Sequence, residues 1–166
     1  MRGIGSGVIA VAACSLFAAG AEDAGFRHEK YLPSTLAGEI AAHPHDPGAD
    51  RWIEGGDFRY RFRVTLAGRS RPLEKAVDLL LNEWAKALGH PRSTRALFKH
   101  EVLVREGDNE YWLPIQEPLM KPLAKEVKPG GELDLYVMRL GSLPAGVVFV
   151  INEFMAFPPP QSRPAG

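Results

Sequence analysis

The sequence predicts an α+β domain, mainly β, in which five antiparallel strands form a small barrel or sheet with one long and one short helix. Residues 58–66 alternate apolar and polar side chains, residues 72–88 carry apolar side chains at helical spacing, and residues 147–151 are apolar on both faces. The 17 glycines and 14 prolines among 166 residues predict short elements joined by substantial loops.

The strand over residues 58–66 is the clearest β element, because a period of two places one face in a core and the other in water. Its apolar face carries Phe58, Tyr60, Phe62, Val64 and Leu66. Its polar face carries Arg59, Arg61, Arg63 and Thr65. The aromatic and β-branched content also favours a strand.

The long amphipathic helix is expected over residues 72–88, because Pro72 suits a first turn and Gly89 and Pro91 end the pattern. Its apolar stripe, which we expect to be buried, consists of Leu73, Ala76, Val77, Leu80, Leu81, Trp84 and Leu88.

The remaining elements set the predicted topology. Strands over 99–105 and 110–115 flank a turn composition at 106–109, a short helix occupies 117–127, and strands follow over 132–140 and 147–156. Five strands with a short helix between the third and fourth is the element order of the OB barrel, with the long helix as an insertion after the first strand. An open antiparallel α+β sheet with both helices on one face is the alternative.

The first 21 residues resemble a secretory signal peptide, with Arg2 before an apolar stretch and a small-residue cleavage site at Ala19-Gly20-Ala21. We therefore expect a periplasmic or secreted protein that loses Cys14, the only cysteine, and has no disulfide. The alternative is a lipid anchor on Cys14, because Val11-Ala12-Ala13-Cys14 resembles a bacterial lipoprotein box. Cleavage after Ala21 is favoured, because the apolar run continues past Cys14.

Three regions follow the signal segment. Residues 22–56, rich in proline and glycine, are expected to be an irregular arm in which Ser34 caps a short helix that ends near Ala42. Residues 57–156 form the single globular β-rich domain, and residues 157–166 form a proline-rich tail.

The charge balance and the motifs exclude several functions. With 20 basic and 20 acidic residues the chain lacks the basic excess typical of a nucleic-acid binder. It carries no nucleophile elbow, phosphate-binding loop, dinucleotide fingerprint or metalloprotease motif. We therefore expect no cofactor and favour a non-catalytic protein, with a small hydrolase without a local signature as an alternative.

The first candidate site is a row of arginines on the polar face of the first strand and just beyond it, namely Arg59, Arg61, Arg63, Arg69 and Arg71. Planar guanidinium groups repeated at this spacing can bind a carboxylated or anionic partner. In the alternative interpretation, carboxylates across the sheet such as Glu132 and Asp134 neutralise them. Neighbouring Tyr111 and Trp112 must face opposite ways in a strand, so one of them is expected at an exposed rim that can contact a protein.

The second candidate site is a metal site formed by His28, His43, His45 and Asp46, whose imidazole and carboxylate groups are ligand types for zinc or copper. A solvated loop is the alternative, because the segment is rich in proline and has no further spaced ligand. Three more polar residues interrupt apolar strands. Arg139 continues an apolar face, while Asn152 and Glu153 end an apolar run, where we expect the strand to emerge into solvent.

Together these features favour an exported binding or assembly module of the bacterial envelope. Its partner is expected to be another envelope protein, contacted through the arginine-bearing sheet face and the Tyr111–Trp112 rim. A membrane contact is expected only if Cys14 is lipidated, and a metal-binding periplasmic protein is the competing hypothesis.

Overall fold

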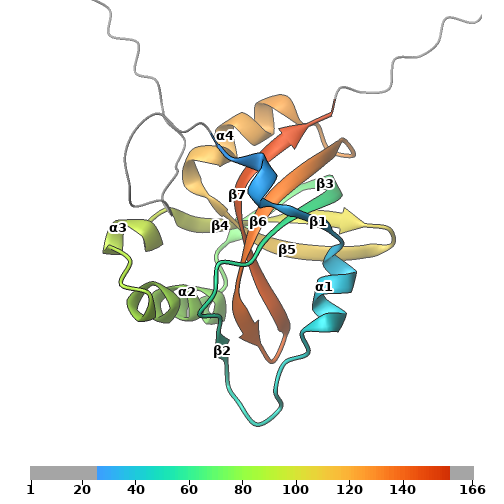
Figure 1. Ribbon diagram of the computed structural model, residues 1–166. Helices are drawn as coiled ribbons and strands as arrows, with labels where there is room; N and C mark the ends of the chain where they lie inside the picture. The colour runs from blue at the N-terminus through green and yellow to red at the C-terminus, as the bar shows by residue number, and fades with distance from the viewer. Residues whose placement is uncertain (1–25, 158–166) are drawn as a thin grey trace, which may run out of the picture.

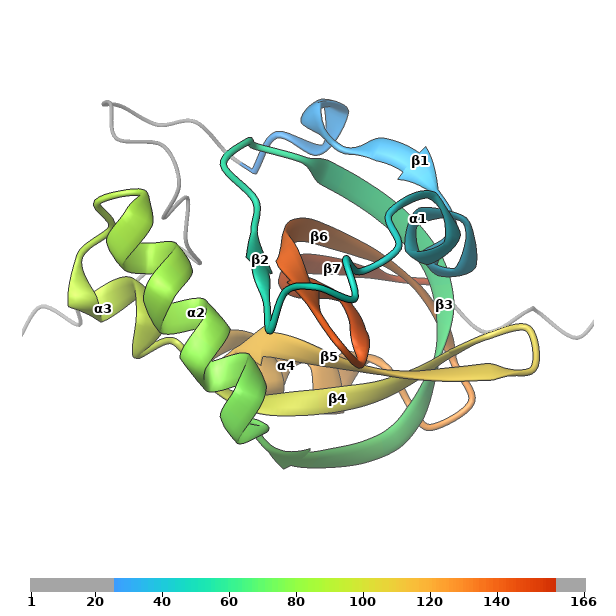
Figure 2. The same ribbon diagram turned by 90° about the horizontal axis from the view of Figure 1, so that it is seen from below.

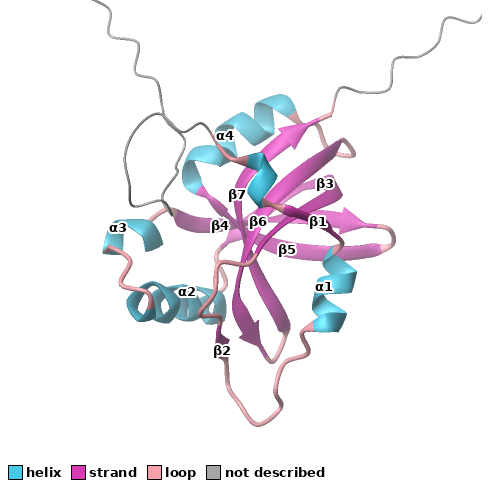
Figure 3. Cartoon of the chain, viewed as in Figure 1, coloured by secondary structure: helices cyan, strands magenta, loops and turns pink. Residues whose placement is uncertain are grey.

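The computed structural model describes residues 26–157, which form an α+β protein, mainly β, with one seven-stranded mixed sheet and four α-helices (Figure 1 and Figure 3). The strands are β1 (Leu32–Ser34), β2 (Trp52–Ile53), β3 (Arg59–Pro72), β4 (Phe98–Glu106), β5 (Asn109–Gln116), β6 (Glu132–Leu143) and β7 (Gly146–Ala156). The helices are α1 (Leu36–Ala42), α2 (Lys75–Ala87), α3 (Arg92–Arg95) and α4 (Glu117–Glu126), preceded by a 3-10 turn at His28–Lys30. Within residues 26–157, every helix is too short or too polar to cross a lipid bilayer.

Five of the strands close into a ring in the order β3-β4-β5-β7-β6, because β3 pairs with both β4 and β6 (Figure 2). The first half of β3 pairs with β6 and the second half pairs with β4. The register with β4 shifts between Leu66 and Ser70, and Gly68 inside this bulge has φ of 76°. A Cβ at Gly68 would also overlap the Pro129 side chain, so the bend that closes the ring requires glycine here.

The predicted five-stranded antiparallel arrangement is wrong in two respects. The sheet has seven strands, and it is mixed because β1 runs parallel to β3 and β5 runs parallel to β7. The two additional strands come from the segment expected to be an irregular arm, where β2 pairs with Gly141 and Ser142 of β6. With three and two residues, β1 and β2 are too short to show a period of two in the sequence.

Two helix starts also differ from the prediction. Pro72 ends β3 rather than opening a helix, so α2 begins at Lys75. Thr35, not Ser34, caps α1, because the Thr35 hydroxyl accepts the Gly38 N–H at 3.1 Å. The predicted ends of both elements agree with the structure within a residue, and α4 spans Glu117–Glu126 with Pro122 in its interior.

The sheet separates two apolar cores. The first fills the ring, where Leu119 and Leu123 of α4 pack against apolar side chains of the strands. The second lies on the opposite face of the β6–β7 hairpin, against α2 (Figure 2). Alternation along β7 divides its residues between the two, with Phe149 and Ile151 in the first and Val148 and Val150 in the second. The stripe predicted for α2 is buried at Val77, Leu80, Leu81 and Trp84. The prediction is wrong for Ala76 and Leu88, which are exposed near the two ends of the stripe.

One of the attachments of the N-terminal segment to the ring is made by a carboxylate on β4. Glu106, at the end of β4, accepts the backbone N–H of Leu36 at 2.8 Å and that of Ala37 at 2.9 Å. These two donors lie in the first turn of α1, where backbone N–H groups have no partner within the helix. A negative charge at this end also interacts favourably with the helix dipole.

We expect Glu106→Gln to lower the free energy of unfolding by about 1–2 kcal/mol, because one of two charge-assisted hydrogen bonds is lost and the other is weakened. Urea denaturation measures this difference. Glu110→Gln is the matched control on the same hairpin, where the carboxylate is half exposed and bonds only to arginine side chains. Its expected cost is below about 0.5 kcal/mol. Equal costs for the two variants would contradict the attachment of α1 through Glu106.

Candidate functional site

The five arginines of the predicted row fall into two groups, because β3 bends between them. Arg59, Arg61 and Arg63 lie on the half of β3 that pairs with β6. Arg69 lies within the bulge, and Arg71 lies beyond it on the half that pairs with β4. The structure therefore does not bring all five together, and only the second group meets one of the two predicted aromatic residues.

Arg69, Arg71 and Trp112 form a surface that we call the arginine–tryptophan patch. The guanidinium of Arg71 lies 4.4 Å from the centre of the Trp112 ring, and that of Arg69 lies 6.0 Å from it. Trp112 is on β5, so these contacts cross β4, which separates β3 from β5. Alternation explains the arrangement, because Trp112 pairs with Leu103 and Arg71 pairs with Glu101, two residues away on the same side of β4.

The buried carboxylate of Glu101 holds Arg71 of the patch in place. The Glu101 side chain is 2% exposed, and its Oε2 accepts the Nε–H of Arg71 at 2.6 Å. Burial raises the pKa of the Glu101 carboxyl above the ordinary value of 4.5, while the hydrogen bond from Arg71 acts in the opposite direction. A buried carboxylate requires such a partner, so Arg71 has its position fixed over the indole ring.

The charges of the patch are balanced by ion pairs. Glu110 pairs with Arg69 at 3.0 Å and with Arg105 at 3.2 Å. Arg71 pairs with Glu74 at 3.3 Å in addition to Glu101. Three arginines therefore face three glutamates, and the patch offers no excess positive charge to a polyanion.

Tyr111 and Trp112 face opposite ways, as expected for neighbours in a strand. Tyr111 packs against the core inside the ring, and burial raises the pKa of its phenol. Of these two residues only Trp112 belongs to the arginine–tryptophan patch. Both are half-buried, so the expectation of an exposed aromatic residue at the rim is wrong.

The first three arginines are engaged elsewhere. Arg63 donates to Asp134 at 3.0 Å and lies 4.2 Å from the centre of the Phe157 ring. Arg61 lies 4.0 Å from the same carboxylate, and Arg59 donates to Asp57 at 2.6 Å. Asp134 is one of the two carboxylates expected to neutralise this face, and it holds the pKa of Arg63 above its ordinary value by accepting a hydrogen bond.

The four residues of the predicted metal site do not come together. His28 stacks on Tyr136 at 4.5 Å, and His45 bonds to the Ser142 hydroxyl and the Ala49 carbonyl. His43 bonds to the Glu39 carbonyl, and Asp46 accepts the Gly48 N–H in a turn. Within residues 26–157, no group of three or more His, Cys, Asp or Glu side chains could hold a metal ion. The geometry of these residues gives the metal hypothesis no support.

The strand does not emerge into solvent at Asn152, so that expectation is wrong. Asn152 is buried, accepts a hydrogen bond from Gln116 at 3.2 Å and donates to the Tyr31 hydroxyl at 3.3 Å. Register shifts in the β6–β7 pair place Glu153 opposite Tyr136, and burial raises the pKa of Glu153. These groups link the N-terminal segment to the ring, an association that the sequence pattern does not reveal.

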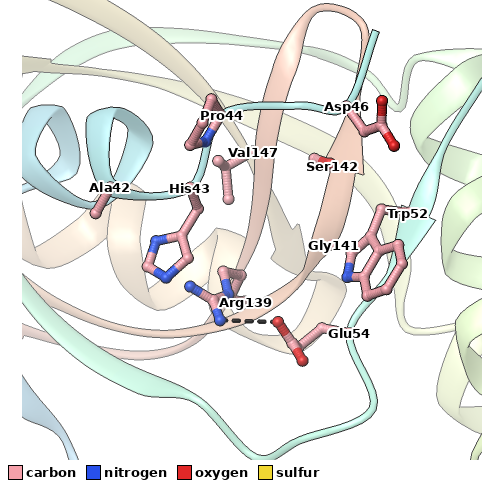
Figure 4. A pocket seen from close by; sticks show the side chains of 10 residues that line it. All are labelled: Ala42, His43, Pro44, Asp46, Trp52, Glu54, Arg139, Gly141, Ser142 and Val147. Carbon is pink, nitrogen blue, oxygen red and sulfur yellow. Dashed lines mark hydrogen bonds and ion pairs between the residues drawn. The ribbon is translucent and has the colours of Figure 1, made fainter. Parts of the chain in front are cut away.

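A second polar site involves residues that the sequence analysis did not group. A cavity of about 300 Å³ lies between the loop after α1, β2 and the β6–β7 hairpin (Figure 4). Its lining includes His43 and Asp46, both named from sequence, together with Arg139 and Glu54. The one sequence signal was Arg139, which interrupts an apolar face.

We expect the burial of Glu101 to be visible as a pH dependence of stability. The folded-state pKa of Glu101 lies above the ordinary value of 4.5, so protonated Glu101 favours the folded state. This contribution to the free energy of unfolding is fully present below pH 4.5 and is lost as the pH rises through the folded-state pKa. Glu101→Gln cannot ionise, so its unfolding free energy relative to wild type should increase between about pH 4 and about pH 8. Urea denaturation at both pH values tests this, and an unchanged difference would contradict it.

No family model, no curated protein and no solved structure matches the chain.

Proposed function

We propose that this protein is an exported, non-catalytic binding or assembly module of the bacterial envelope, and that it contacts a protein partner through the arginine–tryptophan patch. The observation that carries the proposal is the position of Arg71, which lies 4.4 Å from the Trp112 ring centre while its Nε–H bonds to the buried Glu101.

The ordering of these side chains supports a role in binding. Tryptophan and arginine are enriched among the residues that dominate protein–protein affinity. Immobilising a flexible side chain at an interface costs about 0.5–1.5 kcal/mol, so a guanidinium that is already fixed loses less on binding. Arg71 and Arg69 are held by ion pairs to Glu101 and Glu110 before any partner arrives.

The charge balance supports a protein partner rather than a nucleic acid. Nucleic-acid affinity depends on neutralising phosphates with unpaired cations. In the patch each arginine pairs with a glutamate, and the whole chain has equal numbers of basic and acidic residues. A protein surface that carries both hydrogen-bond donors and acceptors can instead bond to the arginines and to the glutamates of the patch.

We propose further that the ring of β3, β4, β5, β6 and β7 is an OB barrel. The order β3-β4-β5-β7-β6 with closure between β3 and β6, and α4 between the third and fourth ring strands, supports this proposal. In OB barrels the face of the second and third strands binds ligands, and these are β4 and β5 here. Trp112 lies on that pair of strands.

The proposed location depends on residues 1–21 and Cys14, which lie outside the described residues. We propose a periplasmic or secreted protein, with an envelope protein as its partner. A membrane attachment is proposed only for a chain lipidated at Cys14.

Mass spectrometry of the protein purified untagged from its host tests the location. A chain that begins at Glu22 is expected, because the small residues before it form a signal-peptidase site. A chain that begins at Cys14 and carries added acyl mass would show that the protein is lipid-anchored and not released as a free protein. A chain that retains residues 1–21 would contradict the proposed export.

Photo-cross-linking in the host tests the partner-binding face. A photoreactive amino acid at position 112 should yield one protein adduct, and Arg69→Glu should reduce its yield at least tenfold by placing two carboxylates side by side. Arg51→Glu is the matched control, because Arg51 is likewise an exposed arginine in an ion pair, with Glu83 at 3.0 Å. No adduct at position 112, or equal loss in both variants, would contradict the proposed face.

A further inference from the structure

The cavity beside Arg139 contains a charged group with an unused hydrogen-bond donor. Arg139 is 5% exposed, its Nη2 donates to Glu54 at 2.8 Å, and its guanidinium lies 4.5 Å from the centre of the Phe58 ring. Its Nη1 is buried and has no hydrogen-bond partner among the described residues. Most buried polar groups have a partner, and leaving a charged donor unpaired is costly.

The structure around this donor has the composition of a small-molecule site. The cavity of about 300 Å³ is at the small end of the range for such sites, about 300–1,000 Å³. Figure 4 shows the guanidinium between the Glu54 carboxylate and the His43 ring, with the Trp52 indole on the side of Glu54. Trp52 is 59% exposed, so a large apolar ring face borders a set of polar groups.

Trp52 is held in this position by a close backbone approach. β2 pairs with Gly141 and Ser142 of β6, and the Glu54 N–H donates to the Leu140 carbonyl at 2.8 Å. Gly141 has φ of 151°, and a Cβ there would overlap the Trp52 carbonyl oxygen. The backbone of Trp52 and the Arg139–Glu54 pair therefore have a fixed relation, which a binding site requires.

The charges of the cavity favour an uncharged ligand. Glu54 already neutralises Arg139, and Asp46 adds a second carboxylate to the lining. An anion would meet this surplus negative charge, and an ammonium group could not accept a hydrogen bond from Arg139 Nη1. A hydroxyl group can accept from Arg139 Nη1 and donate to the Glu54 carboxylate, which has further lone pairs.

We propose that this cavity binds one pyranose ring of a neutral sugar. The apolar C–H face of the ring stacks on Trp52, and vicinal hydroxyls bond to Arg139 Nη1 and to Glu54. His43, whose side chain is 40% exposed, shifts to admit the hydroxyl that reaches Nη1. This site is separate from the arginine–tryptophan patch and does not depend on the proposed protein partner.

Titration of the full chain with methyl β-glucopyranoside, methyl β-galactopyranoside and methyl N-acetyl-β-glucosaminide tests the proposal. We expect at least one of them to move the Trp52 indole N–H resonance saturably, with Kd on the order of 1 mM, while the Trp112 resonance stays in place. No shift of Trp52 with any of the three would overturn the proposal. So would a larger shift with sodium acetate, because an acetate ion accepts hydrogen bonds but cannot donate them.

Matched tryptophan variants keep the test independent of folding. Trp52→Ala removes an exposed side chain and should weaken the sugar at least tenfold in saturation-transfer difference spectra, because the stacking surface is lost. Trp112→Ala should leave sugar binding unchanged. Equal binding by Trp52→Ala and wild type would overturn the assignment. A disaccharide of the sugar that binds distinguishes the two sources of the pyranose ring. A lower Kd for the disaccharide than for the methyl glycoside supports the end of a glycan chain as the ligand, and an equal Kd supports a free monosaccharide.

Discussion

The double pairing of β3 is the constraint on which the rest of the structure depends. One strand of 14 residues pairs with β6 along its first half and with β4 along its second half, so the ring closes only if the strand bends between them. The bulge at Gly68 supplies that bend. It also separates the five arginines into two groups, and only the second reaches Trp112. A change in closure would therefore alter the proposed binding face together with the core.

The sequence patterns predicted the elements that bury one face over many residues. Residues 58–66 and 72–88 were recognised as strand and helix because burial of one face produces a period of two or of 3.6 in the side chains. The start of α2 and the end of β3 were missed, because Pro72 is compatible with a strand end as well as with a first helical turn. β1 and β2 were missed because two or three residues cannot display a period.

Sites were less predictable than elements, since they depend on residues far apart in the chain. Arg69, Arg71 and Trp112 were named from sequence as two separate features, and only the register of β3, β4 and β5 brings them together. Arg139 was noted as an interruption of an apolar face, but its partner Glu54 lies 85 positions earlier in the chain. Local patterns identify an unusual residue, whereas tertiary pairing identifies what it does.

The attachments of the N-terminal segment also determine the order in which the chain can fold. β1 needs β3, α1 needs Glu106 at the end of β4, and β2 needs Gly141 and Ser142 near the end of β6. Ordering contacts between residues so far apart requires closing long loops, which is slow. Residues 32–53 are thus among the last to dock, although they are synthesised before the strands that hold them. A chain built in this way stays unfolded until nearly all of it is present, which is the state in which a polypeptide can be threaded through a narrow channel.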